Sequence, residues 1–169
     1  MKIFHYIKNI TLLPLYLTSK NIPKVKKKWV FGSWFGGKYS DNSKYFFEYC
    51  SKSTDIDAIW ITKSKSVLGE VRKRGYRAHY YTSIPGLFAQ ATAEAAFVTQ
   101  SVYTDLFPSS IAGKTKIIQL WHGIPIKKIM HDAKRIKRKP PISLKFPFLG
   151  HRQDFVISTS PAINEVLSS

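Results

Sequence analysis

The sequence predicts an α/β fold in which a parallel sheet is covered by helices on both faces. Short apolar runs alternate along the chain with segments whose apolar residues recur at helical spacing. The runs themselves are continuously apolar, which is typical of strands that are buried on both faces of a sheet. At 169 residues, 44% of them hydrophobic, the chain can build one domain with a substantial core.

The expected strands are the apolar runs that end at glycine or polar residues. Gly32, Gly36 and Gly37 interrupt the pattern after the first run. The run that precedes His122 is the clearest buried strand. The expected strands cover residues 29–31, 56–61, 76–81, 116–121 and 155–158.

The expected helices follow from apolar spacing and from the signals at their ends. Ser40 or Asp41 can cap a helix, because a short side-chain oxygen accepts the free backbone N–H groups of the first turn. Gly75 has the position of a C-terminal glycine, and the alanine-rich helix of residues 87–96 runs into residues 97–99. The expected helices lie within residues 1–17, 41–49, 67–74, 87–96 and 126–139, and another begins near Ser160.

Charge and composition limit the possible functions. The chain has 27 lysines and arginines against 10 acidic residues, a formal net charge of +17. This excess attracts polyanions, and by itself it leaves nucleic acid, anionic lipid and phosphate-rich polymers open. The single cysteine, Cys50, excludes an internal disulfide framework and a cysteine-based zinc site, and we expect it to be a buried structural thiol. No glycine-rich loop of the ATPase or dehydrogenase type is present.

Residues 1–23 are expected to form an amphipathic helical region in front of a domain at residues 24–169. Apolar residues recur at helical spacing up to Leu17, interrupted by Lys2, His5 and Lys8. No stretch of the chain approaches the roughly 20 apolar residues that span a bilayer. The helix either packs on the domain or lies on a membrane surface, and the sequence leaves both open.

The stretch after the clearest strand has the chemistry of a candidate site. His122 follows the strand and is followed by Gly123 and by Pro125, which presets a first helical turn. Ligands bind at the carboxyl edge of open α/β sheets, and a helix N-terminus offers free N–H groups to a phosphate. His122 can act as a general base beside an anion held by Gly123, Lys127 and Lys128. The alternative is a core or loop histidine without a catalytic role.

Other polar residues have two interpretations each. Asp41 and Asn42 either contact an acceptor or serve the helix that follows them. Ser158 and Ser160 lie at the expected carboxyl end of a strand, where they either hold a polymer phosphate or serve a turn and a cap.

Residues 126–149 combine a basic amphipathic helix with an apolar loop. Apolar residues recur on one face of the expected helix, and basic residues surround them. Each basic residue near an anionic surface contributes about 1 kcal/mol, so this segment is expected to dock on a membrane. The alternative is a helix that packs on the domain with solvated charges. The expected docking residues are Lys134, Arg135, Lys137, Arg138, Lys139, Phe146 and Phe148.

Residues 119–128 resemble the Trp/Phe-His-Gly-x-Pro-x-Lys signature of the CDP-glycerol glycerophosphotransferase family, the teichoic acid polymerases and primases. Further segments fit the order of motifs in that family. The resemblance therefore extends over residues 28–169. The further matching segments are residues 29–33, 36–45, 59–62, 99–101 with Asp105, and 155–160.

The resemblance implies a GT-B architecture of two Rossmann-like domains, of which this chain is the N-terminal acceptor domain. It implies that His122 activates an acceptor hydroxyl, which attacks CDP-glycerol or CDP-ribitol and releases CMP without a metal or cofactor. The implied partners are a membrane-anchored polyol-phosphate acceptor and an anionic bilayer at the cytoplasmic face of a bacterial cell membrane. The sequence ends at Ser169, so the implied C-terminal donor domain is absent from it.

Two other functions are weighed against a transferase. A nucleic-acid-binding module would suit the charge, but the aromatics fall within strand and helix patterns and no recognition signature is present, so no specific nucleic acid is expected. The other is a non-catalytic, membrane-bound partner or a truncated remnant.

Overall fold

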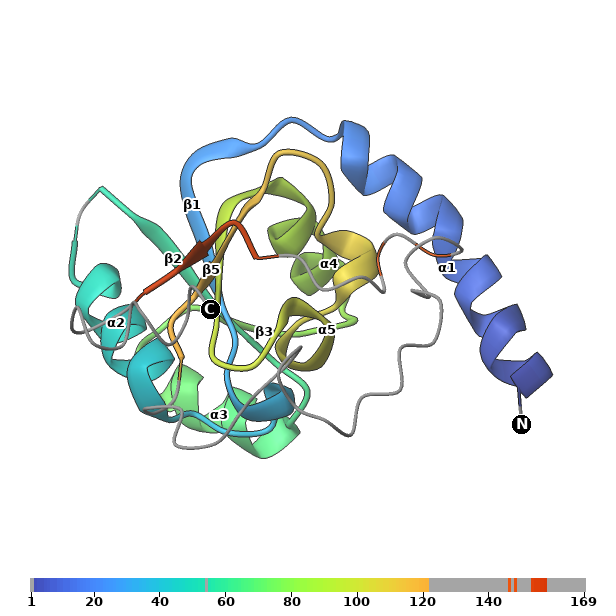
Figure 1. The fold of residues 1–169 in the computed structure, drawn as a ribbon. Coiled ribbons are helices and arrows are strands. Elements are labelled where there is room, and N and C mark those ends of the chain that lie inside the picture. The colour runs from blue at the N-terminus through green and yellow to red at the C-terminus, as the bar shows by residue number, and fades with distance from the viewer. Residues whose placement is uncertain (1, 54, 122–145, 147, 149–152, 158–169) are drawn as a thin grey trace, which may run out of the picture.

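The computed structural model describes residues 2–53, 55–121, 146, 148 and 153–157, and it contains one parallel sheet (Figure 1). The strand order is β3-β2-β1-β4-β5-β6, and each neighbouring pair is parallel. This is the strand order of a Rossmann-like, doubly wound sheet. The strands are β1 (Val25–Phe31), β2 (Asp57–Thr62), β3 (Ala78–Tyr80), β4 (Ala93–Val98), β5 (Lys116–Gln119) and β6 (Phe155–Val156).

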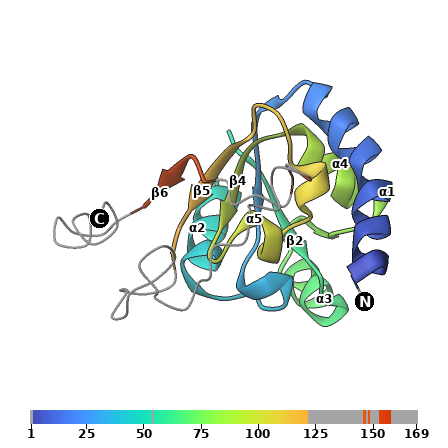
Figure 2. The same ribbon diagram turned by 45° about the vertical axis from the view of Figure 1, so that its right-hand side comes forward.

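Helices cover both faces of the sheet, as predicted. One core layer joins the sheet to α2 and α3, and a second joins its other face to α4 and α5. Figure 2 shows α2 and α4 on opposite sides of the strands. The helices are α1 (Lys2–Asn21), α2 (Asp41–Ser51), α3 (Lys65–Lys73), α4 (Ile84–Thr92) and α5 (Val102–Asp105), with short 3-10 turns η1 (Trp34–Gly36) and η2 (Pro108–Ser110).

Successive residues of the central strands point into different layers. In β1, Phe31 packs in the layer with α2 and Val30 in the layer with α4. In β2, Trp60 packs in the layer with α2 and Ile61 in the layer with α4. Each of these four side chains is fully buried. The continuously apolar runs in β1 and β2 therefore reflect burial on both faces, whereas the edge strand β6 is exposed at Phe155 and Val156.

The chain leaves α4 earlier than predicted. Alanine favours helices, and residues 93–96 were expected to continue the helix. Instead β4 begins at Ala93, and Ala95 and Ala96 pair with β5 while they are at most 6% exposed. Small side chains fit between the two packed helical layers at the centre of the sheet, so tertiary packing overrides the helical propensity.

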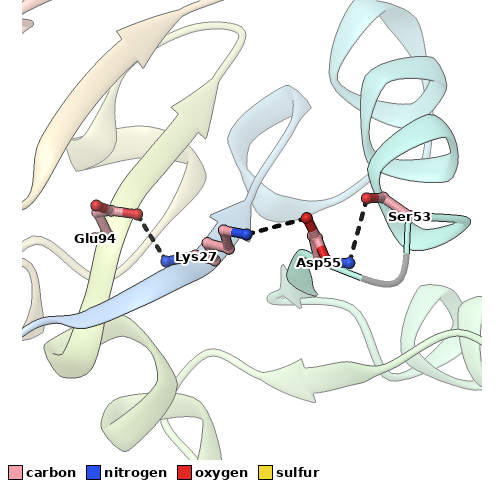
Figure 3. A network of polar contacts seen from close by, with 4 residues as sticks. All are labelled: Lys27, Ser53, Asp55 and Glu94. Carbon is pink, nitrogen blue, oxygen red and sulfur yellow. Dashed lines mark hydrogen bonds and ion pairs between the residues drawn. The ribbon is translucent and has the colours of Figure 1, made fainter.

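A bulge at the start of β1 lengthens this strand beyond the prediction. β1 carries extra residues between the pairs Val25–Ala93 and Trp29–Ala95, and Lys27 has a left-handed φ of 61°. The Lys27 backbone N–H donates to the Glu94 carboxylate at 2.8 Å, and its ammonium donates to Asp55 at 3.1 Å (Figure 3). The bond to Glu94 gives the Lys27 N–H an acceptor in place of the strand partner that it lacks at the bulge.

The C-terminal part of α1 packs on the domain. The Ser19 hydroxyl is fully buried and donates to the Ser109 carbonyl at 3.2 Å. α1 also contacts α4. None of the helices in the described part of the chain combines the length and the apolar character needed to cross a bilayer.

Candidate functional site

The centre of the carboxyl edge is the point where the sheet changes direction. β1 and β4 pair side by side, and from them the chain order proceeds outward in opposite directions, to β2 and β3 or to β5 and β6. The loops after such a pair of strands diverge and leave room for a ligand. The residues that follow β1, β4 and β5 therefore form the candidate site.

Asp105 joins the loop after β1 to the loop after β4. Its side chain is 0% exposed. One carboxylate oxygen accepts from the Phe35 N–H at 2.8 Å, and the other accepts from the Thr99 and Gln100 N–H groups at 2.9 and 2.8 Å. An ionised carboxylate is an acceptor only, so three backbone donors match it. The Thr104 hydroxyl also donates to it, at 3.3 Å.

The turn η1 is held by several elements at once. The Trp34 backbone N–H donates to the Thr99 hydroxyl at 3.2 Å. The Gly36 carbonyl accepts from the Lys63 N–H at 2.7 Å and from the Thr62 hydroxyl at 2.8 Å. Figure 2 shows this short blue turn next to α5. β2, β4 and α5 therefore all fix the position of the loop after β1.

Left-handed backbone conformations gather at this edge. Trp34, Phe35, Asp41 and Trp121 have φ values of 44°, 58°, 60° and 60°. A residue with a side chain costs about 1–3 kcal/mol in this region, and it persists only where its surroundings impose it. Such clusters are typical of ligand-binding sites.

Asp41 and Asn42 connect η1 to the residues in front of His122. The Asp41 carboxylate accepts from the Trp34 indole N–H. The Asn42 amide donates to the carbonyls of Leu120 and Trp121 at 3.0 and 3.2 Å. Both side chains therefore build the site through protein contacts. Their direct contact with an acceptor stays a prediction.

Gln119 fixes the loop after β4 from the other side. Its side-chain amide donates to the carbonyls of Thr99 and Gln100, each at 2.9 Å, and the side chain is 1% exposed. Residues 119–121, which lead to the candidate histidine, are thus bonded both to α2 and to the loop after β4.

Lys63 brings a partly buried cation to the same edge. Its ammonium donates to the Thr104 carbonyl and lies 5.5 Å from the centre of the Tyr81 ring. Burial lowers the pKa of Lys63 below its ordinary value, and the nearby Asp105 carboxylate opposes part of this shift. The ammonium and the Asp105 carboxylate are neighbouring opposite charges in a partly dry environment.

Most of the predicted site residues lie outside the described residues. These are the candidate base, its predicted anion-binding neighbours, the two serines after β6 and the basic docking residues. Their roles stay predictions. They are His122, Gly123, Lys127, Lys128, Ser158, Ser160, Lys134, Arg135, Lys137, Arg138 and Lys139.

Phe146 and Phe148 require a correction. Both were expected to dock on a membrane, but each is only 4% exposed. Their ring centroids are 5.8 Å apart, and the Phe148 ring lies 5.5 Å from that of Tyr16 in α1. Two apolar rings lose their contact with water by packing against the domain and α1, so in this structure they are unavailable to lipid.

The sequence pattern assigns no role to Asp105, Lys63 or Phe35. Asp105 matches the family order of motifs only through its spacing from residues 99–101. The available signal in the sequence was an aspartate four residues beyond the polar residues 99–101; its burial, which requires several hydrogen-bond donors, is seen only in the structure. No local pattern marks Lys63 or Phe35, whose contacts come from distant segments.

The comparisons with known proteins agree on one family. The family described as CDP-Glycerol:Poly(glycerophosphate) glycerophosphotransferase matches residues 15–169. A teichoic acid poly(glycerol phosphate) polymerase of Staphylococcus epidermidis is 30% identical over 184 residues, covering 99% of this chain and 24% of the relative. A teichoic acid glycerol-phosphate transferase of Staphylococcus aureus is 27% identical over 162 residues, covering 92% of this chain and 40% of the relative.

Solved structures show the same fold. A histidine variant of the wall teichoic acid polymerase TagF matches with a TM-score of 0.67 and 26% identity, over 99% of this chain and 42% of that chain. The chain thus spans less than half the length of these relatives. From the match to residues 15–169, the chain belongs to the CDP-glycerol:poly(glycerophosphate) glycerophosphotransferase family.

Proposed function

We propose that this chain forms the acceptor-binding half of a glycerophosphotransferase that extends a teichoic-acid-like or capsular polyol-phosphate polymer. The donor is CDP-glycerol or a related CDP-alditol such as CDP-ribitol. The chain spans 24% to 42% of the relatives described above, and in this proposal the donor-binding residues lie in a second domain outside the matched region. The complete enzyme then has two Rossmann-like domains that face each other, as in a GT-B architecture.

The observation that carries this proposal is the pair of hydrogen bonds from Asn42 to Leu120 and Trp121. They hold the end of β5 at the carboxyl edge of the sheet, and His122 is the next residue in the sequence. Trp121 has a left-handed backbone, so the direction in which the chain continues is imposed by its surroundings. A reactive residue directly after such an anchored position suits catalysis, which depends on orientation.

In the proposed reaction, His122 accepts the proton of the terminal acceptor hydroxyl. The hydroxyl oxygen attacks the β-phosphorus of the CDP-linked donor, the bond from that phosphorus to the bridging oxygen breaks, and CMP leaves. Gly123, Lys127 and Lys128 bind phosphate near the reacting atoms, and Ser158 and Ser160 hold a phosphate of the polymer. Positive charge and N–H donors stabilise the charge that develops on phosphoryl oxygens.

The acceptor in this proposal is anchored in a membrane, and the protein binds peripherally to the cytoplasmic face. The basic residues of the 126–149 segment, Lys134, Arg135, Lys137, Arg138 and Lys139, supply the attraction to anionic lipid. The two phenylalanines of that segment are left out, because their rings are buried. Co-sedimentation with neutral and anionic vesicles tests this part. Equal binding of a variant with Lys134, Arg135, Lys137 and Arg138 changed to Glu would contradict it.

A chimera tests the transferase itself. This chain replaces the matching segment of the Staphylococcus epidermidis polymerase, and transfer of labelled glycerol phosphate from CDP-glycerol to a membrane-bound acceptor is measured. We expect transfer by the chimera, its loss in His122→Ala, and its retention in the control His131→Ala. A folded chimera without transfer would argue against the proposal, and base-dependent affinity for nucleic acid would favour a nucleic-acid-binding module instead.

A further inference from the structure

We infer that Phe35 is a substrate-contacting residue, whose ring packs against the carbon chain of the polyol-phosphate acceptor; this rests on the proposed function. The ring is 55% exposed, although an aromatic side chain of this size favours burial. It belongs to η1, directly after the central strand β1 and at the point where the sheet changes direction. Neither the family resemblance nor the sequence pattern assigns it a role.

The backbone of Phe35 is strained in a way that its own packing does not explain. Its φ is 58° and its ψ is 22°, a left-handed conformation that glycine adopts more easily than phenylalanine. The next residue, Gly36, also has a positive φ, of 74°. A glycine at position 35 would therefore serve the turn better, so stability alone does not account for phenylalanine there.

The polar groups around Phe35 are occupied by contacts that fix the turn, whereas its ring is left to solvent. The Phe35 N–H donates to the buried Asp105 carboxylate at 2.8 Å. The neighbouring Trp34 is bonded through its backbone to Thr99 and through its indole to Asp41. The turn is thus rigid, and a rigid aromatic ring binds a ligand with little loss of conformational entropy.

Phe35 is linked to Trp121, the residue before the candidate histidine in the sequence, through a short chain of contacts. Trp34 is bonded to Asp41, and the next residue, Asn42, is bonded to the carbonyl of Trp121. The turn that presents the Phe35 ring and the residue before His122 are therefore held by two consecutive residues of α2. An acceptor whose end reaches His122 would then pass close to this turn.

The surroundings match a polyol-phosphate chain in both of its chemical parts. The C–H groups of the polyol suit an aromatic face, and its phosphates suit cations. Lys38 supplies a cation, with its ammonium 4.8 Å from the centre of the Trp34 ring. A second exposed aromatic, Tyr103, belongs to α5, the helix that contacts η1, and is 45% exposed.

Calorimetric titration of the full chain with a synthetic oligo(glycerol phosphate) tests the inference. The informative variant is Phe35→Gly, because it removes the ring and also relieves the left-handed strain. We expect its Tm to equal or exceed that of the wild type, while its Kd for the oligomer rises about tenfold, from the lost apolar contact. Phe35→Ala should weaken binding equally without the gain in stability. Tyr45→Ala is the control, since Tyr45 is a 67% exposed aromatic on α2.

The outcomes separate this inference from the function on which it rests. Weaker binding in both Phe35 variants, with Tyr45→Ala unchanged, supports the contact. Wild-type affinity in the folded Phe35→Gly variant would overturn the inference and leave the proposed function intact. Absence of oligomer binding by the wild-type chain would overturn both.

Discussion

The side-chain amide of Asn42 donates a hydrogen bond to the backbone carbonyl of Trp121, with 3.2 Å between nitrogen and oxygen. Asn42 lies at the start of α2, and Trp121 lies two residues after the end of β5. The same amide also reaches the carbonyl of Leu120. One side chain at a helix N-terminus therefore fixes the position from which the candidate histidine leaves the sheet.

Replacing Asn42 by alanine should lower catalysis more than stability. The variant loses two hydrogen bonds near the surface, which together contribute about 1–2 kcal/mol to the free energy of unfolding. In the chimera assay we expect a clear loss of kcat, because the histidine that follows Trp121 loses its anchor. Asn21→Ala is the control, because the Asn21 amide likewise donates to a backbone carbonyl, that of Leu17 in α1. This bond lies far from the carboxyl edge of the sheet. Equal kcat in both variants would contradict the anchoring role.

Asp105→Asn should destabilise the domain by at least about 3 kcal/mol, although the two side chains have nearly the same volume. Each carboxylate oxygen accepts from a backbone N–H, so an amide nitrogen at either place would face a donor. Urea unfolding followed by circular dichroism measures the change. Asp55→Asn is the matched control, since its ion pair with Lys27 is largely exposed and should change stability by less than about 1 kcal/mol. Similar midpoints for the two variants would refute the prediction.

Two neighbouring glycines of the turn should respond differently to alanine. Gly36 has a φ of 74°, and an added Cβ would lie 2.7 Å from Cγ of Lys63, so Gly36→Ala should cost about 2 kcal/mol or more. Gly37 has a φ of −102°, and the nearest atom to an added Cβ is 3.5 Å away. Gly37→Ala should therefore be neutral or slightly stabilising. Thermal unfolding of both variants measures the difference in stability. An equal loss of Tm would argue against a special steric restriction at Gly36.

His79 should make stability fall as the solution becomes acidic. Burial lowers the pKa of His79 below its ordinary value of 6.5, and the positive charges of Arg72 and Arg77 lower it further, while Asp57 opposes them. Below pH 6.5 the unfolded chain binds a proton that the folded chain does not, so the free energy of unfolding declines until the lower folded pKa is reached. Since the ring is partly exposed, the slope should stay well under the single-proton limit of about 1.4 kcal/mol per pH unit. His79→Gln should flatten the slope between about pH 7 and pH 5; an unchanged slope would rule out this contribution.

The Cys50 thiol should resist alkylation in the folded protein. It is 1% exposed, and burial raises its pKa to about 11, so both access and the thiolate fraction are low. Reaction with iodoacetamide at neutral pH should be slow in buffer and rapid in guanidinium chloride. Mass spectrometry of the two time courses makes the comparison, and fast labelling of the native protein would show that the helix α2 opens readily.

The sequence alone was sufficient for the overall architecture. The alternation of apolar runs with helical spacing predicted a parallel sheet between two helical layers, and the order of motifs indicated the family. These features are local: whether a strand is buried on both faces is recorded in its own residues, such as Val30, Phe31 and Trp60. The prediction that Cys50 is a buried thiol is also confirmed.

The limits of local pattern appear at the alanines of β4 and at Phe146 and Phe148. Alanine favours a helix by its own propensity, but pairing with β1 and β5 places residues 93–96 in a strand. Two phenylalanines beside a basic segment suggested a lipid contact, but the Phe148 ring packs against Tyr16 of α1. In both cases the deciding contact comes from a residue far along the chain.

The candidate site at the carboxyl edge of the sheet was also only partly predictable from the sequence. The sequence by itself determined that a histidine follows a buried strand and that glycines interrupt the chain after β1. Only the tertiary structure decided that Asp105 bonds Phe35, Thr99 and Gln100 at once, and that Asn42 holds the carbonyl of Trp121. Hydrogen bonds between the segments that follow different strands leave no periodic pattern in the sequence, because they depend on where the parallel strands bring those segments together.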